Sequence, residues 1–305
     1  MLVGSASLGA VGLAACTTDE SWSGQAAGDG RASAPPNGEP VADLTPGGRP
    51  SEIDGVLSDT TLLALGNGRV LRLGAAADTV TLVDNGAPLW TAGGTGSEPG
   101  RFQLIGGAAL GPDGSFWIVD TGNRRVQVLS ATGELAKVVG APEAAAVPLR
   151  RPAAVAVAPD GRAFVADAGR SGVVPFSADG VAGELIGGFG SDRPFVGIIA
   201  LEVVADELVV VEALAPRVQV RDLDGAWLRT IDLPAHFTTV DIAVDGDQVY
   251  LVSHDGRLAR TRLDGSTDAE GLEVLGHVGG TARGLHLGPD GLIVAARPLA
   301  IGSLQ

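Results

Sequence analysis

The sequence predicts an all-β protein: a six-bladed β-propeller preceded by a flexible N-terminal tether. A unit of four short strands recurs six times after Arg49, and each unit is rich in apolar residues. Equivalent positions of the first strands lie 40 to 47 residues apart, at Leu65, Leu110, Val157, Val204, Val244 and Leu287. A repeat of this length with four strands per unit is typical of a propeller blade. No segment has a convincing helical period, so a two-domain α/β fold has no support.

The composition limits the possible functions of the chain. Its 305 residues carry a formal net charge of −15, which argues against a nucleic-acid partner because such proteins present a basic surface. The apolar fraction of 45% is enough for a sizeable core. A single cysteine excludes an intrachain disulfide and a metal site with several thiolate ligands.

The pattern of the first residues indicates a targeting signal. Leu2–Ala15 is small, apolar and uncharged, which suits the core of a signal peptide better than a permanent membrane span. The end of this stretch, Leu13-Ala14-Ala15-Cys16, resembles the bacterial lipobox. That resemblance implies cleavage after residue 15, a lipid on Cys16, and a membrane anchor on the outer face of the cytoplasmic membrane. The alternative is an ordinary cysteine at the end of a buried strand.

Residues 16–50 form the expected linker, and residues 51–305 the expected propeller. The linker is rich in Gly, Ala, Ser, Pro and acidic residues, and Trp22 is almost its only large apolar side chain. Such a segment cannot bury enough surface to offset its chain entropy, so we expect a flexible tether.

Within each unit, the second strand is a continuous apolar run, as in Phe116–Val119 and Ala163–Ala166. A strand covered on both faces loses its alternation, which fits an inner strand between neighbouring blades. The third strand alternates, as in Val126–Val128, and we expect it nearer the rim. Turns such as Pro112-Asp113-Gly114 supply the residues that tight hairpins need.

The stretch Asp120–Val128, with the sequence DTGNRRVQV, resembles the NHL repeat family. The match is specific in this unit and weaker in the others. It implies six blades, of which the last ends in its third strand. We expect a strand from between Val41 and Ser58 to close the ring, since an open blade would leave an unpaired edge. A truncated C-terminus is the alternative.

An acid followed five residues later by arginine recurs, at Asp120 and Arg125 and again at Glu212 and Arg217. These pairs are interpreted as structural links between loops. Arginines elsewhere on the same face of the ring are candidates for binding a carboxylate or phosphate by paired hydrogen bonds. The candidates for contact with an anionic ligand are Arg151, Arg283 and Arg297.

A metal site is the competing hypothesis. Hard oxygen ligands suit calcium, and the acids that could surround the axis are Asp120, Asp167, Glu212 and Asp241. Zinc would need three or four converging ligands, and the histidines are His236, His254, His277 and His286. Some relatives of NHL proteins are zinc or calcium enzymes, namely lyases and lactonases.

The sequence contains no assembled catalytic motif. The leading hypothesis is therefore an extracytoplasmic bacterial lipoprotein without a cofactor, whose NHL-like propeller is a binding scaffold for another envelope protein or an anionic ligand. The alternative is a zinc- or calcium-dependent lyase or hydrolase that acts in the central channel. Fold alone does not decide between them.

Overall fold

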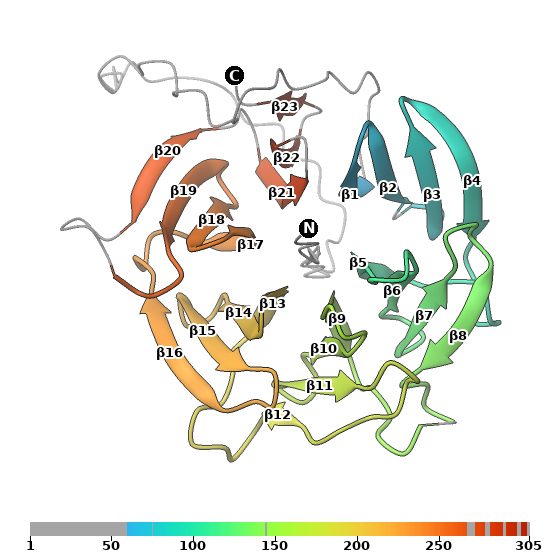
Figure 1. The fold of residues 1–305 in the computed structure, drawn as a ribbon, viewed down its shortest axis with the longest axis horizontal. Coiled ribbons are helices and arrows are strands. Elements are labelled where there is room, and N and C mark those ends of the chain that lie inside the picture. The colour runs from blue at the N-terminus through green and yellow to red at the C-terminus, as the bar shows by residue number, and fades with distance from the viewer. Residues whose placement is uncertain are drawn as a thin grey trace, which may run out of the picture.

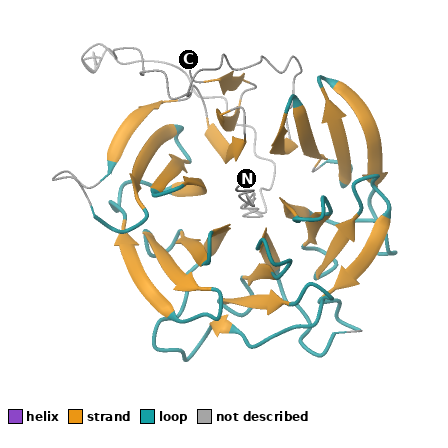
Figure 2. Cartoon of the chain, viewed as in Figure 1, coloured by secondary structure: helices purple, strands orange, loops and turns teal. Residues whose placement is uncertain are grey.

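The computed structural model is a ring of β-sheets around a central axis (Figures 1 and 2). The residues that it describes are 60–74, 76–143, 145–266, 272–277, 281–288, 291–297 and 300–303. None of these residues lies in a helix, as the sequence predicts. Accordingly, no helix among them has the length and apolar character needed to cross a membrane.

Five sheets have four strands each, and all strand pairs are antiparallel. The first blade contains β1 (Thr60–Gly66), β2 (Arg69–Gly74), β3 (Thr79–Asp84) and β4 (Ala87–Gly93). The second contains β5 (Ile105–Leu110), β6 (Phe116–Asp120), β7 (Arg125–Leu129) and β8 (Leu135–Val139). The third contains β9 (Pro152–Val157), β10 (Ala163–Asp167), β11 (Gly172–Phe176) and β12 (Ile186–Gly187).

The second half of the ring continues this pattern. The fourth blade contains β13 (Ile198–Val204), β14 (Glu207–Glu212), β15 (Arg217–Asp222) and β16 (Trp227–Asp232). The fifth contains β17 (Thr239–Asp245), β18 (Gln248–Ser253), β19 (Arg257–Arg262) and β20 (Glu273–His277). The last sheet has three strands, β21 (Thr281–Gly288), β22 (Gly291–Arg297) and β23 (Ala300–Ser303).

The propeller is thus established with five complete blades, and the prediction of six blades is corrected accordingly. The last sheet lacks a fourth strand within the described residues. It lies between β17 and β1, the first strands of the blades on either side (Figure 1). The predicted closing strand between Val41 and Ser58, like the tether and Cys16, lies outside the described residues.

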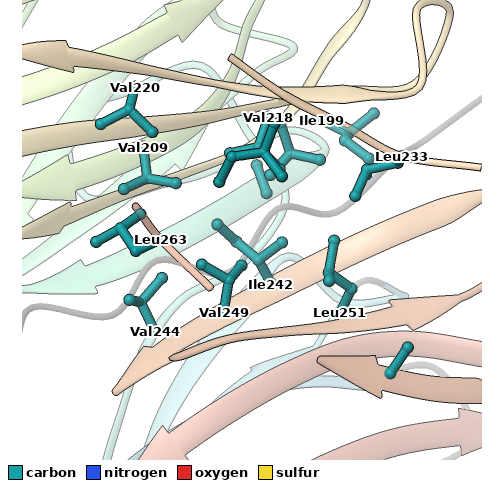
Figure 3. Packing of buried hydrophobic residues seen from close by; sticks show 14 of the residues in the cluster. Ile199, Val209, Val218, Val220, Leu233, Ile242, Val244, Val249, Leu251 and Leu263 are labelled. Atoms are coloured by element: carbon teal, nitrogen blue, oxygen red, sulfur yellow. The ribbon is translucent and has the colours of Figure 1, made fainter. Parts of the chain in front are cut away.

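The core lies between the blades rather than within any one of them. Figure 3 shows the contact between the fourth and fifth blades, where Ile199 and Val209 from one sheet meet Ile242 and Leu251 from the next. Similar buried clusters fill the interfaces between the other consecutive sheets, from the first blade to the last sheet. Because apolar burial is the main stabilising term, each blade depends on its neighbours.

The second strands are buried along their whole length in two blades, as their apolar runs predict; β6 and β10 have no exposed residue. The third strand β7 is also fully buried, so its alternation does not mark a solvent face. The outer strand β8 is the exposed one. The polar residue at the centre of β7 is Gln127, whose side chain is buried and forms hydrogen bonds with Arg101 and Asp120.

We call the side of the ring that holds the loops between second and third strands, together with the connections between blades, the loop face. The two kinds of segment are hydrogen-bonded to each other there. The Gly122 amide donates to the Gln103 carbonyl at 2.7 Å, and the Ala168 amide donates to the Arg151 carbonyl at 2.9 Å. In these two blades the loop after the second strand is therefore bonded to the connection that leads into the same blade.

Candidate functional site

Three blades place a fully buried acid at the end of the second strand. The residues are Asp120 on β6, Asp167 on β10 and Glu212 on β14. Each carboxylate accepts hydrogen bonds from the chain segment that leads into the first strand of the same blade. For Asp120 the donor is the Gln103 amide, at 2.8 Å. A buried carboxylate needs such donors because its desolvation is costly.

In the second blade, the structure brings Asp120 and Arg125 together. Arg125 Nε lies 2.7 Å from Asp120 Oδ2, and the side chains of Asn123 and Gln127 donate to the same carboxylate. The other end of Arg125 donates to the carbonyl oxygens of Glu98 and Arg101. The buried pair therefore fastens the connection between the first two blades.

The fourth blade repeats the arrangement. Arg217 Nε lies 2.7 Å from Glu212 Oε2, and Gln219 Nε2 donates to the same oxygen at 2.8 Å. Glu212 also accepts the Val196 amide, in the segment before β13. The hydrogen bond with Glu212 raises the pKa of the Arg217 guanidinium. This pair occupies the same place in its blade as Asp120 and Arg125.

The third blade uses a variant of this arrangement. Asp167 accepts the amides of Arg150 and Arg151 at 2.9 and 2.8 Å, and Arg170 Nε lies 3.2 Å from the carboxylate. The arginine follows the acid by three residues here and not by five. Sequence spacing alone therefore missed Arg170, although it performs the same neutralising role.

The fourth acid of the metal hypothesis, Asp241, lies elsewhere in its blade. It belongs to the first strand β17, and its carboxylate accepts the amides of Ile242 at 2.9 Å and Leu285 at 3.0 Å. Leu285 is on β21, so Asp241 links two neighbouring sheets close to the axis. The other three acids are at the ends of second strands, in three other blades.

Beside Asp241, the structure reveals a buried acid that sequence reasoning missed. Glu202 on β13 is 4% exposed, and within the described residues its Oε2 has no hydrogen-bond partner. Burial, together with the nearby charge of Asp241, raises the pKa of Glu202 well above its ordinary value. A backbone hydrogen bond from Val244 acts in the opposite direction. The signal in the sequence was a single acid within an apolar first strand, IIALEVV.

The histidines are dispersed. His286 is buried on β21, whereas His236, His254 and His277 are exposed at loops or a strand end of the fifth blade. In the part of the chain that the structure describes, no group of three or more potential ligands is placed to hold a metal ion. The acids proposed for calcium coordination each accept hydrogen bonds from protein groups.

Of the arginines expected to contact a ligand, Arg151 is exposed on the loop face. Arg150 beside it and Arg124 in the loop after β6 are exposed as well. Across these described segments, none of the three guanidinium groups forms a hydrogen bond or ion pair. Arg283 and Arg297 belong to β21 and β22, and their side chains lie outside the described part of the structure.

We name Arg124, Arg150 and Arg151, together with the exposed Leu104, the arginine patch. Thr121 joins its parts, because its hydroxyl donates to the Pro152 carbonyl at 2.8 Å and its amide donates to the Leu104 carbonyl at 3.2 Å. The patch therefore lies on the loop face where the second and third blades meet. It combines unpaired cations with one large apolar side chain.

No family model and no curated protein matches the chain, so the NHL resemblance depends on the motif alone. Solved structures do match the fold. One is a catalytically inactive virginiamycin B lyase from Staphylococcus aureus with quinupristin, at 14% identity and a TM-score of 0.56, covering 77% of this chain and 75% of that one. Another is a streptogramin B lyase, at 13% identity and a TM-score of 0.55, covering 79% of this chain and 91% of the other. At this identity the likeness establishes the propeller fold alone.

Proposed function

We propose that the protein is an extracytoplasmic lipoprotein of a bacterial membrane, anchored through Cys16, whose propeller is a non-enzymatic binding scaffold. In this proposal the three-stranded sheet of β21, β22 and β23 completes an NHL-like ring beside the five full blades. The observation that carries the scaffold role is the structural task of Asp120, Asp167 and Glu212 on the loop face. Each of these acids is occupied in fastening a connection between blades. The loops are thereby preorganised, so that they lose little conformational entropy when a partner binds.

The lipid anchor predicts a simple labelling result. We expect the full chain, made in a bacterial host, to incorporate radiolabelled palmitate and to sediment with membranes. Cys16→Ser removes the only thiol of the chain and should abolish both properties. Thr17→Ser is the matched control and should keep them. A wild-type chain that stays unlabelled, or a labelled Cys16→Ser chain, would refute the anchor.

A second candidate function is a metal-dependent lyase of the central channel. It is favoured by the two lyases of similar fold. Glu202, Asp241 and His286 lie on the first strands β13, β17 and β21, but within the described residues they do not form a group placed to hold a metal ion. Carboxylates and imidazole are suitable ligands and acid–base groups. The scaffold proposal instead assigns Asp241 to the link between blades.

An assay on quinupristin separates the two candidates. The full chain is incubated with quinupristin and with zinc, calcium or a chelator, and the products are followed by mass spectrometry. We expect quinupristin to remain intact in every condition. Conversion that needs metal and that disappears in His286→Ala would establish the lyase and exclude the scaffold proposal.

A further inference from the structure

We propose that the arginine patch binds a short acidic peptide segment, in which one or two carboxylates flank an apolar side chain. This inference rests on the scaffold role proposed above and names the site and the class of ligand. Arg124, Arg150 and Arg151 would hold the carboxylates, and Leu104 would contact the apolar side chain. Guanidinium groups suit this task because they bind carboxylates through two parallel hydrogen bonds.

The three cations lie on segments fixed close to one another. The Arg124 amide donates to the Thr121 carbonyl at 3.1 Å, which closes a tight turn, and the Thr121 hydroxyl is bonded to Pro152, the neighbour of Arg151. Both amides of the Arg150-Arg151 pair are anchored on buried Asp167. The backbone beneath the patch is therefore preorganised, which lowers the entropic cost of binding.

The acids beneath the patch do not cancel its charge. Asp120 is fully buried against Arg125, and Asp167 is fully buried beside Arg170. Each of these carboxylates already has a cationic partner of its own. The patch arginines are consequently available to a ligand, in contrast to Arg217, whose guanidinium is bonded to Glu212.

The backbone at the patch adds an independent observation. Leu104 and Arg124 have φ angles of 55° and 54°, in the left-handed region that non-glycine residues rarely adopt. For leucine this conformation is strained, because its Cβ lies too close to the following carbonyl oxygen. Leu104 is nevertheless 56% exposed, so burial of its side chain does not offset the strain. Such strain is often retained where a residue contacts a ligand.

The charge of the whole chain favours a small ligand. With a net charge of −15, the protein repels extended anionic surfaces, including membranes rich in acidic lipid. A short segment with one or two carboxylates gains the local attraction of the patch and avoids most of this repulsion. A peptide therefore fits better than a lipid surface.

The test uses the full chain and the labelled peptide acetyl-Gly-Asp-Leu-Glu-Gly, followed by fluorescence anisotropy. We expect saturable binding that weakens as salt is added. The double variant Arg124→Gln/Arg151→Gln should bind at least tenfold more weakly, and so should the peptide in which Asn and Gln replace its acids. Arg260→Gln, which removes one positive charge from β19 in the fifth blade, is the control and should bind as wild type does.

Leu104→Asn separates binding from folding. Asparagine tolerates the left-handed conformation, so the melting temperature should be unchanged or higher while peptide affinity falls several-fold. Equal affinity in all variants would overturn the proposal. Failure of the peptide to bind would also overturn it, whether or not phosphatidylglycerol vesicles or inorganic phosphate bind instead. None of these outcomes alters the quinupristin result, which tests the scaffold role separately.

Discussion

Replacing Asp120 with alanine should lower the free energy of unfolding by about 3–5 kcal/mol, the usual effect of removing one partner of a buried ion pair. The substitution leaves Arg125 with an uncompensated buried charge. It also removes the acceptor for the Gln103 amide and for the Gln127 side chain. Unsatisfied buried donors add their own desolvation cost.

Urea denaturation of the full chain would measure this loss. Asp264→Ala is the control, because Asp264 is an exposed turn residue and its loss should have a much smaller effect. Asp120→Asn keeps one acceptor and should fall between the two. If Asp120→Ala were as stable as Asp264→Ala, the acid would not be an anchor of the loop face.

Replacing Glu202 with glutamine should stabilise the protein at neutral and alkaline pH and leave its stability at low pH nearly unchanged. Burial raises the pKa of Glu202 in the folded state. The folded protein therefore binds a proton that the unfolded chain releases at lower pH. As pH rises from the unfolded pKa to the folded pKa, wild-type stability falls by about 1.4 kcal/mol for each unit of pKa difference.

Glutamine has nearly the same shape as the protonated acid and cannot ionise. The advantage of Glu202→Gln over wild type should therefore appear above the unfolded pKa and grow until the folded pKa is reached. Unfolding midpoints in urea at a series of pH values would measure it. Glu134→Gln, an exposed change on a turn of the second blade, is the control. An advantage independent of pH would show that the pKa of Glu202 is the same in the folded and unfolded states.

The repeat made most of the fold predictable. The apolar run Phe116–Val119 and its counterparts identified the buried second strands, and their regular spacing identified the ring. The alternation in Val126–Val128 was less informative. A polar residue in a strand indicates either a solvent face or a buried partner, and the partner of Gln127 comes from a different part of the sequence.

Much of the site could not be predicted, because it depends on contacts between residues that their spacing in the sequence does not reveal. Asp120 and Arg125 could be paired because the same interval recurs in the fourth blade, whereas Asp167 and Arg170 use a shorter one. The pKa of Glu202 depends on its burial and, to a lesser extent, on the charge of Asp241, which lies on the next blade. The strained conformation of Leu104 could not be predicted from the local sequence, because its backbone is held by hydrogen bonds to Asp78 and Thr121 on two different loops.

We propose that the buried carboxylates of Asp120, Asp167 and Glu212 hold the loops and bind no metal ion. The melting temperature of the full chain in chelator, in calcium and in zinc tests it most directly, since any ion that binds only the folded state raises that temperature. We expect the same melting temperature in all three solutions. A rise of several degrees with calcium or zinc that is lost in Asp120→Asn or Asp167→Asn would contradict it.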